Sequence, residues 1–269
     1  MVTKEIDPQK PAAQTTRQKA KQKPAAKGQA SKATRPTRSV RAKAKVKAGR
    51  YSKAEIQAIF ERFKAANPSP VGELEHTDPY TLVVAVALSA QATDVSVNKA
   101  TRELFRLADT PQKMVALGQD RVSDLIKTIG LFRTKANNVI ALSQMLIDEF
   151  GGEVPRDRDQ LMRLPGVGQK TANVVMNTAF GESTIAVDTH IFRLANRLGL
   201  APGKTPNSVE EALHKVIPDE FKRDSHHWLI LHGRYVCKAR APDCSHCIIA
   251  DLCKYPDKTS EVAFPIAAE

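Results

Sequence analysis

The stretch Leu164-Pro165-Gly166-Val167-Gly168-Gln169-Lys170-Thr171 joins two segments whose apolar spacing predicts helices, at about 157–164 and 169–181. Two glycines around one aliphatic residue permit a tight turn that directs backbone N–H groups outward. The second helix adds free N–H groups and the positive end of its dipole at the same place. The stretch is therefore typical of a helix–hairpin–helix, here about 157–181, and predicts phosphate contacts at Gly166, Val167, Gly168, Gln169 and Thr171.

Lys170 and Asp188 are the candidate catalytic residues. Lys170 lies in the first turn of the second helix, where charge–dipole repulsion favours the neutral, nucleophilic amine, and we expect partial burial to add to this effect. A solvated lysine without a role is the alternative. Asp188 follows the short apolar segment 184–187 and precedes a predicted helix at 188–199. We expect it to cap that helix, and a capping carboxylate is also free to face a cleft.

All four cysteines lie within 17 residues near the C-terminus, at Cys237, Cys244, Cys247 and Cys253. Unrelated thiols would not gather in this way, and nothing in the sequence indicates an oxidising compartment that favours disulfides. A structural zinc site usually has two Cys-x-x-Cys pairs, whereas this stretch has one. One compact loop with four thiolates suits a [4Fe–4S] cluster better, with zinc as the alternative. Such a cluster would present Lys238 and Arg240 to a phosphate backbone.

The positive charge of the chain, +12 in total, is concentrated at the N-terminus. Residues 1–50 carry a net charge of +13, and the other 219 residues carry a net charge of −1. Residues 1–50 also lack Phe, Trp, Tyr and Cys, which predicts a disordered basic tail. We expect the tail to add non-specific affinity for nucleic acid. A solvated tail without a specific role and a targeting segment are the alternatives.

The rest of the chain has helical periodicity and short connections. Ser52 and Glu55 form a capping-box pattern ahead of the first helix, which ends near residue 67. Further helices are predicted at about 79–90, 94–108, 120–128, 133–150, 188–199, 207–217 and 221–238. No Asn-Gly or Asp-Gly turn separates alternating strands, so we expect an all-α fold. The longest apolar run, 82–88, is too short to cross a membrane, and no secretory signal precedes it.

Several of these stretches together resemble the endonuclease III family of bacterial DNA glycosylases. The matching segments are 88–94, 164–175, 187–193, 226–234 and the four-cysteine spacing. The resemblance covers about residues 51–257 and leaves the tail outside. Gln169 departs from the family, whose members often carry arginine there.

The resemblance implies two helical domains that flank a DNA-binding cleft. A six-helix barrel with the helix–hairpin–helix would take 72–185, and a discontinuous iron–sulfur domain would join 51–71 to 186–257. Residues 258–269 would be a C-terminal extension. The chain would hold one [4Fe–4S] cluster and act as a monomer in the bacterial cytoplasm, associated with the nucleoid through DNA.

The resemblance also implies the reaction, which is removal of oxidised pyrimidines from double-stranded DNA followed by strand cleavage at the abasic site. The damaged nucleotide must first leave the duplex. Lys170 would then attack C1′ of its sugar, and Asp188 would assist by taking a proton or stabilising positive charge. Gln91 would fill the gap left by the nucleotide, and Leu131 would act as an apolar wedge.

Three other functions remain open at this stage. An adenine-specific mismatch glycosylase and a monofunctional thymine or uracil mismatch glycosylase share parts of the pattern, but both are expected to lack the lysine at position 170. A non-catalytic helix–hairpin–helix DNA-binding protein would keep the hairpin and the tail without needing Lys170 and Asp188.

Overall fold

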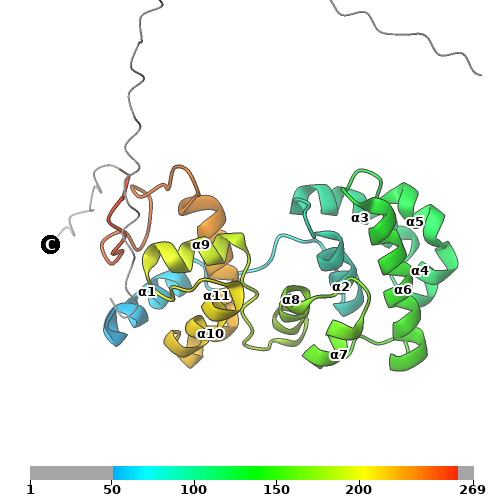
Figure 1. The fold of residues 1–269 in the computed structure, drawn as a ribbon, viewed down its shortest axis with the longest axis horizontal. Helices are drawn as coiled ribbons and strands as arrows, with labels where there is room; N and C mark the ends of the chain where they lie inside the picture. The colour runs from blue at the N-terminus through cyan, green and yellow to red at the C-terminus, as the bar shows by residue number, and fades with distance from the viewer. Residues whose placement is uncertain (1–50, 260–269) are drawn as a thin grey trace, which may run out of the picture. The chain divides into compact units, whose positions relative to one another are not determined.

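The computed structural model describes residues 51–259, and all regular structure in this range is helical, as predicted. The predicted tail, 1–50, and residues 260–269 of the predicted C-terminal extension lie outside the described residues. The elements, most of them labelled in Figure 1, are α1 (Lys53–Ala66), α2 (Pro79–Leu88), α3 (Asp94–Leu107), α4 (Pro111–Leu117), α5 (Gln119–Leu125), α6 (Phe132–Phe150), α7 (Arg158–Arg163), α8 (Gln169–Phe180), α9 (Thr189–Leu198), α10 (Pro206–Val216), α11 (Asp219–Leu231) and the π-helical turn η1 (His232–Val236).

Many of these helices begin where a side chain satisfies the free N–H groups of the first turn. The capping box predicted for α1 is present, because Ser52 accepts from Glu55 N–H while the Glu55 carboxylate accepts from Ser52 N–H. The predicted cap of α9 is also present, and Asp188 Oδ1 accepts from the N–H groups of His190 and Ile191 at 2.8 Å each. Local sequence therefore fixes where these helices start.

One short helix is absent from the helices predicted above. α4 is capped by Thr110 and starts at Pro111, and only Gly118, with φ of 80°, separates it from α5. Its seven residues make only two turns, which is too short for a periodic apolar pattern to stand out. The range predicted to form a six-helix barrel, 72–185, therefore contains seven helical segments.

The last predicted helix ends earlier than expected. α11 stops at Leu231, and the backbone then widens into η1, where Cys237 N–H donates to His232 O at 2.8 Å. The prediction of one continuous helix over 221–238 was wrong because an apolar pattern does not distinguish an α-helix from a π-helical turn. The widened turn ends directly at the first cysteine.

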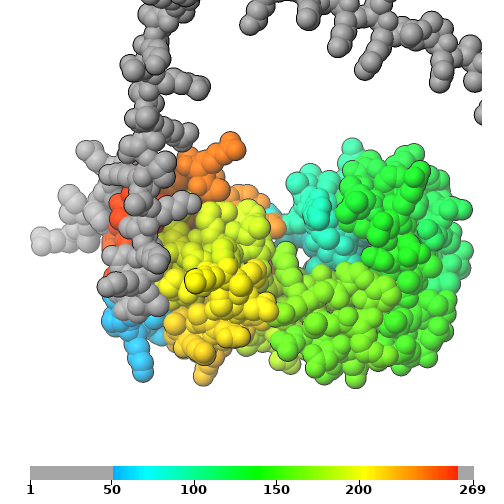
Figure 2. All heavy atoms as spheres, viewed as in Figure 1, coloured from blue at the N-terminus to red at the C-terminus, as the bar shows by residue number. Residues whose placement is uncertain are grey.

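The apolar side chains form two separate clusters. The first is built by α2 to α8 and has Leu88, Leu104 and Leu142 at its centre, all fully buried. The second joins α1 to α9, α10 and α11, and α1 packs against α11 although they are far apart in the sequence (Figure 1). Figure 2 shows the surface hollowed where the yellow and orange segments meet the green and cyan ones. The division into two domains stays a prediction, which the two clusters support.

None of the helices within residues 51–259 combines the length and the apolar character that a bilayer-spanning helix needs.

Candidate active site and cysteine cluster

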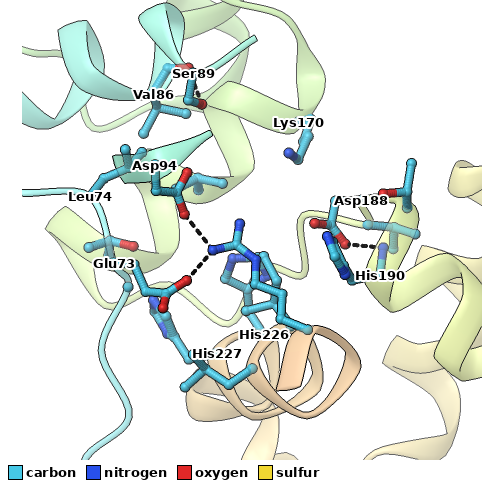
Figure 3. A pocket seen from close by; sticks show the side chains of 18 of the residues that line it. Glu73, Leu74, Val86, Ser89, Asp94, Lys170, Asp188, His190, His226 and His227 are labelled. Carbon is cyan, nitrogen blue, oxygen red and sulfur yellow. Dashed lines mark hydrogen bonds and ion pairs between the residues drawn. The ribbon is translucent and has the colours of Figure 1, made fainter. Parts of the chain in front are cut away.

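A cavity of about 600 Å³ lies between the elements of the two clusters, within the usual size range of ligand pockets. α2 and α8 line it from the first cluster, and α9, α11 and η1 line it from the second. Lys170 and Asp188 both line it, and Figure 3 shows the amine and the carboxylate at the edge of the same space. The structure therefore brings together the two predicted catalytic residues, which are 18 positions apart in the chain.

Lys170 is in the first turn of α8 and its side chain is exposed. The expectation of partial burial was wrong, because the cavity is open to solvent at this edge. No side chain caps α8, whose N-cap is Gly168, so the first N–H groups of the helix have no side-chain acceptor among the described residues. Positive potential from the helix start and from Lys170 meets at this point.

Asp188 performs its capping role with one oxygen. Oδ1 accepts both N–H bonds of the α9 cap, and Oδ2 makes no hydrogen bond to the described residues. The residue is half-buried at the cavity wall. Capping therefore fixes the carboxylate while one oxygen remains available to a molecule in the cavity.

The opposite part of the cavity contains an ion-pair cluster that the sequence patterns did not single out. Arg234 of η1 pairs through Nη1 with the carboxylates of Glu73 and Asp94, which Figure 3 marks by dashed lines. These residues come from η1, the loop before α2 and the start of α3, and 161 positions separate Glu73 from Arg234. No local pattern signals a pairing over that distance.

Two buried histidines of α11 form a further part of the wall. Burial, helped by the nearby charges of His227, Lys170 and Arg234, lowers the pKa of His226 to about 3. Burial also lowers the pKa of His227. Both imidazoles are therefore neutral at pH 7. His226 Nδ1 is buried without a hydrogen-bond partner among the described residues.

The fold requires glycine at only one of the two glycine positions of the hairpin. Gly166 has φ of 81°, and a Cβ there would lie 3.0 Å from Asn138 Nδ2, so the fold itself requires glycine. Gly168 has φ of −98°, and a Cβ there would meet nothing within 4 Å. The fold does not require glycine at 168, which leaves the backbone open to the close approach of another molecule.

Val167, Gln169 and Thr171, the other predicted DNA contacts of the hairpin, differ in how far their side chains are exposed and in what they contact. The Val167 side chain is buried in the first cluster, so only its backbone remains at the surface. The Gln169 amide donates to Glu210 of α10 at 3.3 Å, which turns it towards the second group of helices. Thr171 is half-buried in the first turn of α8.

Gln91 and Leu131 share an unusual backbone. They are the non-glycine residues with left-handed φ in residues 51–259, at 56° and 60°. Both are exposed, and 63% of the Leu131 surface is accessible although the side chain is apolar. Strained, exposed residues of this kind often mark functional positions. The two predicted duplex-inserting residues thus stand out on geometry that was not used to select them.

The four cysteines line one small cavity, together with His232 and Lys258. Cys237 is buried, the other three are half-buried, and none forms a disulfide. No three His, Cys, Asp or Glu side chains within residues 51–259 converge where a single metal ion would fit. A cubane binds one thiolate at each of four irons, and four cysteines around one small cavity provide this set of donors.

The surroundings of the cysteines also fit a cluster that carries positive iron. Burial raises the pKa of the Cys247 thiol to about 11 in the absence of a metal. His232 Nε2 lies 3.6 Å from Cys247 Sγ, and Arg197 lies 3.4 Å from Cys237 Sγ. Arg197 also donates to the carbonyl oxygens of Lys238 and Ala239 at 2.7 and 2.9 Å. Lys238 and Arg240 themselves are exposed.

Comparison with known proteins agrees with both sites. Residues 84–219 match the HhH-GPD superfamily of base excision DNA repair proteins, and residues 237–253 match the iron-sulfur binding domain of endonuclease III. The second match confirms the predicted [4Fe–4S] cluster over zinc.

Individual relatives agree as well. Endonuclease III of Escherichia coli (strain K12) is 58% identical over 207 residues, which cover 77% of this chain and 98% of that protein. A trapped endonuclease III–DNA covalent intermediate superposes with a TM-score of 0.71 at 45% identity, covering 76% of this chain and 97% of the other. A thermostable thymine-DNA glycosylase is more distant, with a TM-score of 0.66 at 25% identity over 75% and 96% of the two chains. The chain belongs to the endonuclease III family of HhH-GPD base excision DNA repair proteins.

Proposed function

We propose that Lys170 and Asp188 carry out, in this chain, the family's removal of oxidised pyrimidines from double-stranded DNA and the cleavage of the resulting abasic site. The observation that carries this proposal is the presence of both residues on one cavity of about 600 Å³. A cavity of this size accommodates an extruded nucleoside. A mismatch glycosylase without a lysine nucleophile, or a DNA-binding protein without a catalytic role, does not account for the pair.

The reaction begins when the Lys170 amine forms a bond to C1′ of the extruded nucleotide and the base leaves with the electron pair of the C1′–N1 bond. Asp188 Oδ2, which makes no hydrogen bond to the described residues, takes the proton that Nζ loses. The sugar ring then opens: the C1′–O4′ bond breaks, O4′ takes the proton held by Asp188, and the nitrogen lone pair of Lys170 forms the C1′=Nζ bond of a protonated Schiff base. The Schiff base acidifies C2′, which loses a proton to water, and the electron pair of that C–H bond expels the 3′ phosphate. Because Lys170 is exposed in the free protein, the DNA that covers the cavity must supply the desolvation that favours its neutral amine.

Contacts to the duplex follow from the hairpin and from the two strained residues. The uncapped start of α8 offers N–H groups to a phosphate, and the open space at Gly168 lets the phosphate come close. Gln91 and Leu131 project from fixed backbone positions and replace the stacking lost when the nucleotide is extruded. Lys238 and Arg240 add backbone charge contacts from the cysteine loop.

Cys237, Cys244, Cys247 and Cys253 would hold the [4Fe–4S] cluster, which, when bound, supplies four iron–thiolate bonds that crosslink the loop. Arg197 and His232 orient the sulfur atoms of this loop. We further propose that the protein acts as a monomer in the cytoplasm and associates with the nucleoid through DNA. The barrel and iron–sulfur domains would correspond to the two apolar clusters.

Borohydride trapping tests the nucleophile. The wild-type protein should form a covalent complex with a duplex that contains an oxidised pyrimidine, and Lys170→Gln should form none while binding the duplex with similar affinity. Lys99→Gln, at an exposed lysine of α3 outside the cavity, is the matched control and should trap like wild type. Trapping by Lys170→Gln at the wild-type yield would assign the Schiff base to another amine.

A further inference from the structure

Within the described residues, one lysine and one arginine line the large cavity, and the proposed reaction uses only the lysine. Lys170 is the nucleophile, whereas Arg234 has no role in the steps above. The Arg234 side chain is mostly buried, with 24% of its surface exposed, although guanidinium groups are usually at the surface. A buried cation on the wall of a reaction site requires an explanation beyond solubility.

The hydrogen bonds of Arg234 leave most of its donors available. Glu73 and Asp94 both accept from Nη1, and within residues 51–259 Nε and Nη2 make no hydrogen bond. A guanidinium has five N–H donors in a rigid fork. The two carboxylates therefore fix the group in place while two of its three nitrogens remain free to bind a ligand.

Two observations place Arg234 on the same cavity as the reacting groups. Lys170, Asp188 and Arg234 line the same cavity. The charges of Lys170 and of Arg234 both contribute, after burial, to the lowered pKa of His226, so both lie within electrostatic range of this one imidazole. Because His226 and His227 on this wall are neutral, the N–H groups of Arg234 Nε and Nη2 are the donors of a charged side chain on a part of the cavity that Lys170 does not occupy.

We propose that Arg234 binds the departing base and stabilises the negative charge that develops on it. When the bond between Lys170 Nζ and C1′ forms, the electron pair of the C1′–N1 bond moves onto the base and is shared with its O2 carbonyl oxygen. Arg234 donates hydrogen bonds to that oxygen, and the base anion later takes a proton from water. Glu73 and Asp94 are positioning residues for the guanidinium. This role rests on the proposed function, which supplies the nucleophile.

The physical argument is that of a preorganised donor in a cavity that the bound duplex covers. A donor fixed before the reaction stabilises the charge that forms in the transition state without the cost of reorienting solvent. Strand cleavage at an abasic site has no departing base. The two activities of the protein should therefore depend on Arg234 to different degrees, which a merely structural arginine would not produce.

The test compares base removal with strand cleavage in the same variant. In single-turnover assays at saturating holoenzyme, Arg234→Met should slow removal of 5-hydroxyuracil by about 10²–10³-fold, the loss typical of one oxyanion donor. Removal of 5-formyluracil, whose electron-withdrawing group makes a better leaving group, should slow less. Cleavage and borohydride trapping at a preformed abasic site should change little. Equal losses on both bases, or an equal loss at the abasic site, would overturn the proposal.

Two further variants separate this role from structural effects. Arg102→Met breaks another ion pair between the same loop and α3, with Glu75, but lies outside the cavity. It should leave all three activities unchanged, and a leaving-group-dependent loss in this control would contradict the assignment. Arg234→Lys keeps a cation for Glu73 and Asp94 if the Met variant is unstable. Arg234→Lys should also slow removal of 5-hydroxyuracil more than removal of 5-formyluracil, although both rates should fall less than in Arg234→Met. Equal slowing of the two bases in Arg234→Lys would also overturn the role.

Failure of the proposed function has a separate outcome. If wild-type protein does not trap at an abasic site, the lysine chemistry itself is wrong. If it traps normally but Arg234→Met removes both bases at the wild-type rate, only the role of Arg234 is wrong.

Discussion

The reaction cavity and the cysteine loop show two different ways of holding functional groups in place. The cavity is lined by the starts of α8 and α9, where helix backbone and a local cap position Lys170 and Asp188. The described part of the loop, from Cys237 to residue 259, contains no α-helix or strand. It is held by side chains such as Arg62 and Arg197, which reach it from α1 and α9, and by the cysteines themselves. Helix ends are specified by nearby residues, whereas the loop needs distant partners and a cofactor.

The largest effect, on the stability of the protein, is expected when one cysteine ligand of the loop is replaced. Cys247→Ser should release the cluster and open the loop, lowering the free energy of unfolding by more than about 4 kcal/mol, as for other lost metal sites. Iron content, visible absorption and thermal unfolding measure this directly. DNA affinity should fall with it, because Lys238 and Arg240 lose their fixed positions. Unchanged thermal unfolding in an iron-free variant would show that the loop does not depend on the cluster.

The next effect is on the chemistry of the cavity. Asp188→Asn should slow base removal by about 10²–10⁴-fold because the general base is lost. Thermal unfolding should change little, since Asn caps helices about as well as Asp. Asp157→Asn, at the cap of α7, makes the same change outside the cavity and is the matched control. If Asp188→Asn removes bases at the wild-type rate, Asp188 caps α9 but is not the general base.

A smaller effect is expected from a side chain that supports the loop. Arg197→Met removes hydrogen bonds to Cys237 Sγ and to the carbonyl oxygens of Cys237, Lys238 and Ala239. The folded state should lose about 2 kcal/mol, the range for bonds made by a charged group. Arg163→Met, which breaks an exposed ion pair with Glu149, should cost at most about 1 kcal/mol. Chemical denaturation measures the free energy of unfolding of both variants. If that free energy falls by the same amount in both, the loop does not depend on distant partners.

The smallest expected effect concerns residues 1–50, which neither region uses. Their deletion should weaken non-specific duplex binding at low salt and reduce the slope of log affinity against log salt by about 0.9 for each phosphate that the basic residues neutralise. Single-turnover base removal at saturating enzyme should barely change. An identical salt slope after truncation would indicate that the basic residues do not bind DNA.

The sequence alone determined what depends on short spans of chain. The caps at Ser52 and Asp188, the glycine turn at 166 and the grouping of the cysteines each follow from a few neighbouring residues, because caps, turns and ligand spacing are local properties. These features also carried the family resemblance. The first turn of α8 and the lysine within it could therefore be predicted from the order of the residues.

Only the tertiary structure decided how distant segments meet. It left Lys170 exposed, turned Gln169 towards Glu210, widened the end of α11 into η1 and joined Arg234 to Glu73 and Asp94. The pairing of Gln169 with Glu210 spans 41 positions, and the pairings of Arg234 with Glu73 and Asp94 span 161 and 140 positions. Periodicity contains no information about such pairs. The physical reason is that local backbone preferences fix where helices begin, while packing of the two apolar clusters fixes which side chains share the cavity between them.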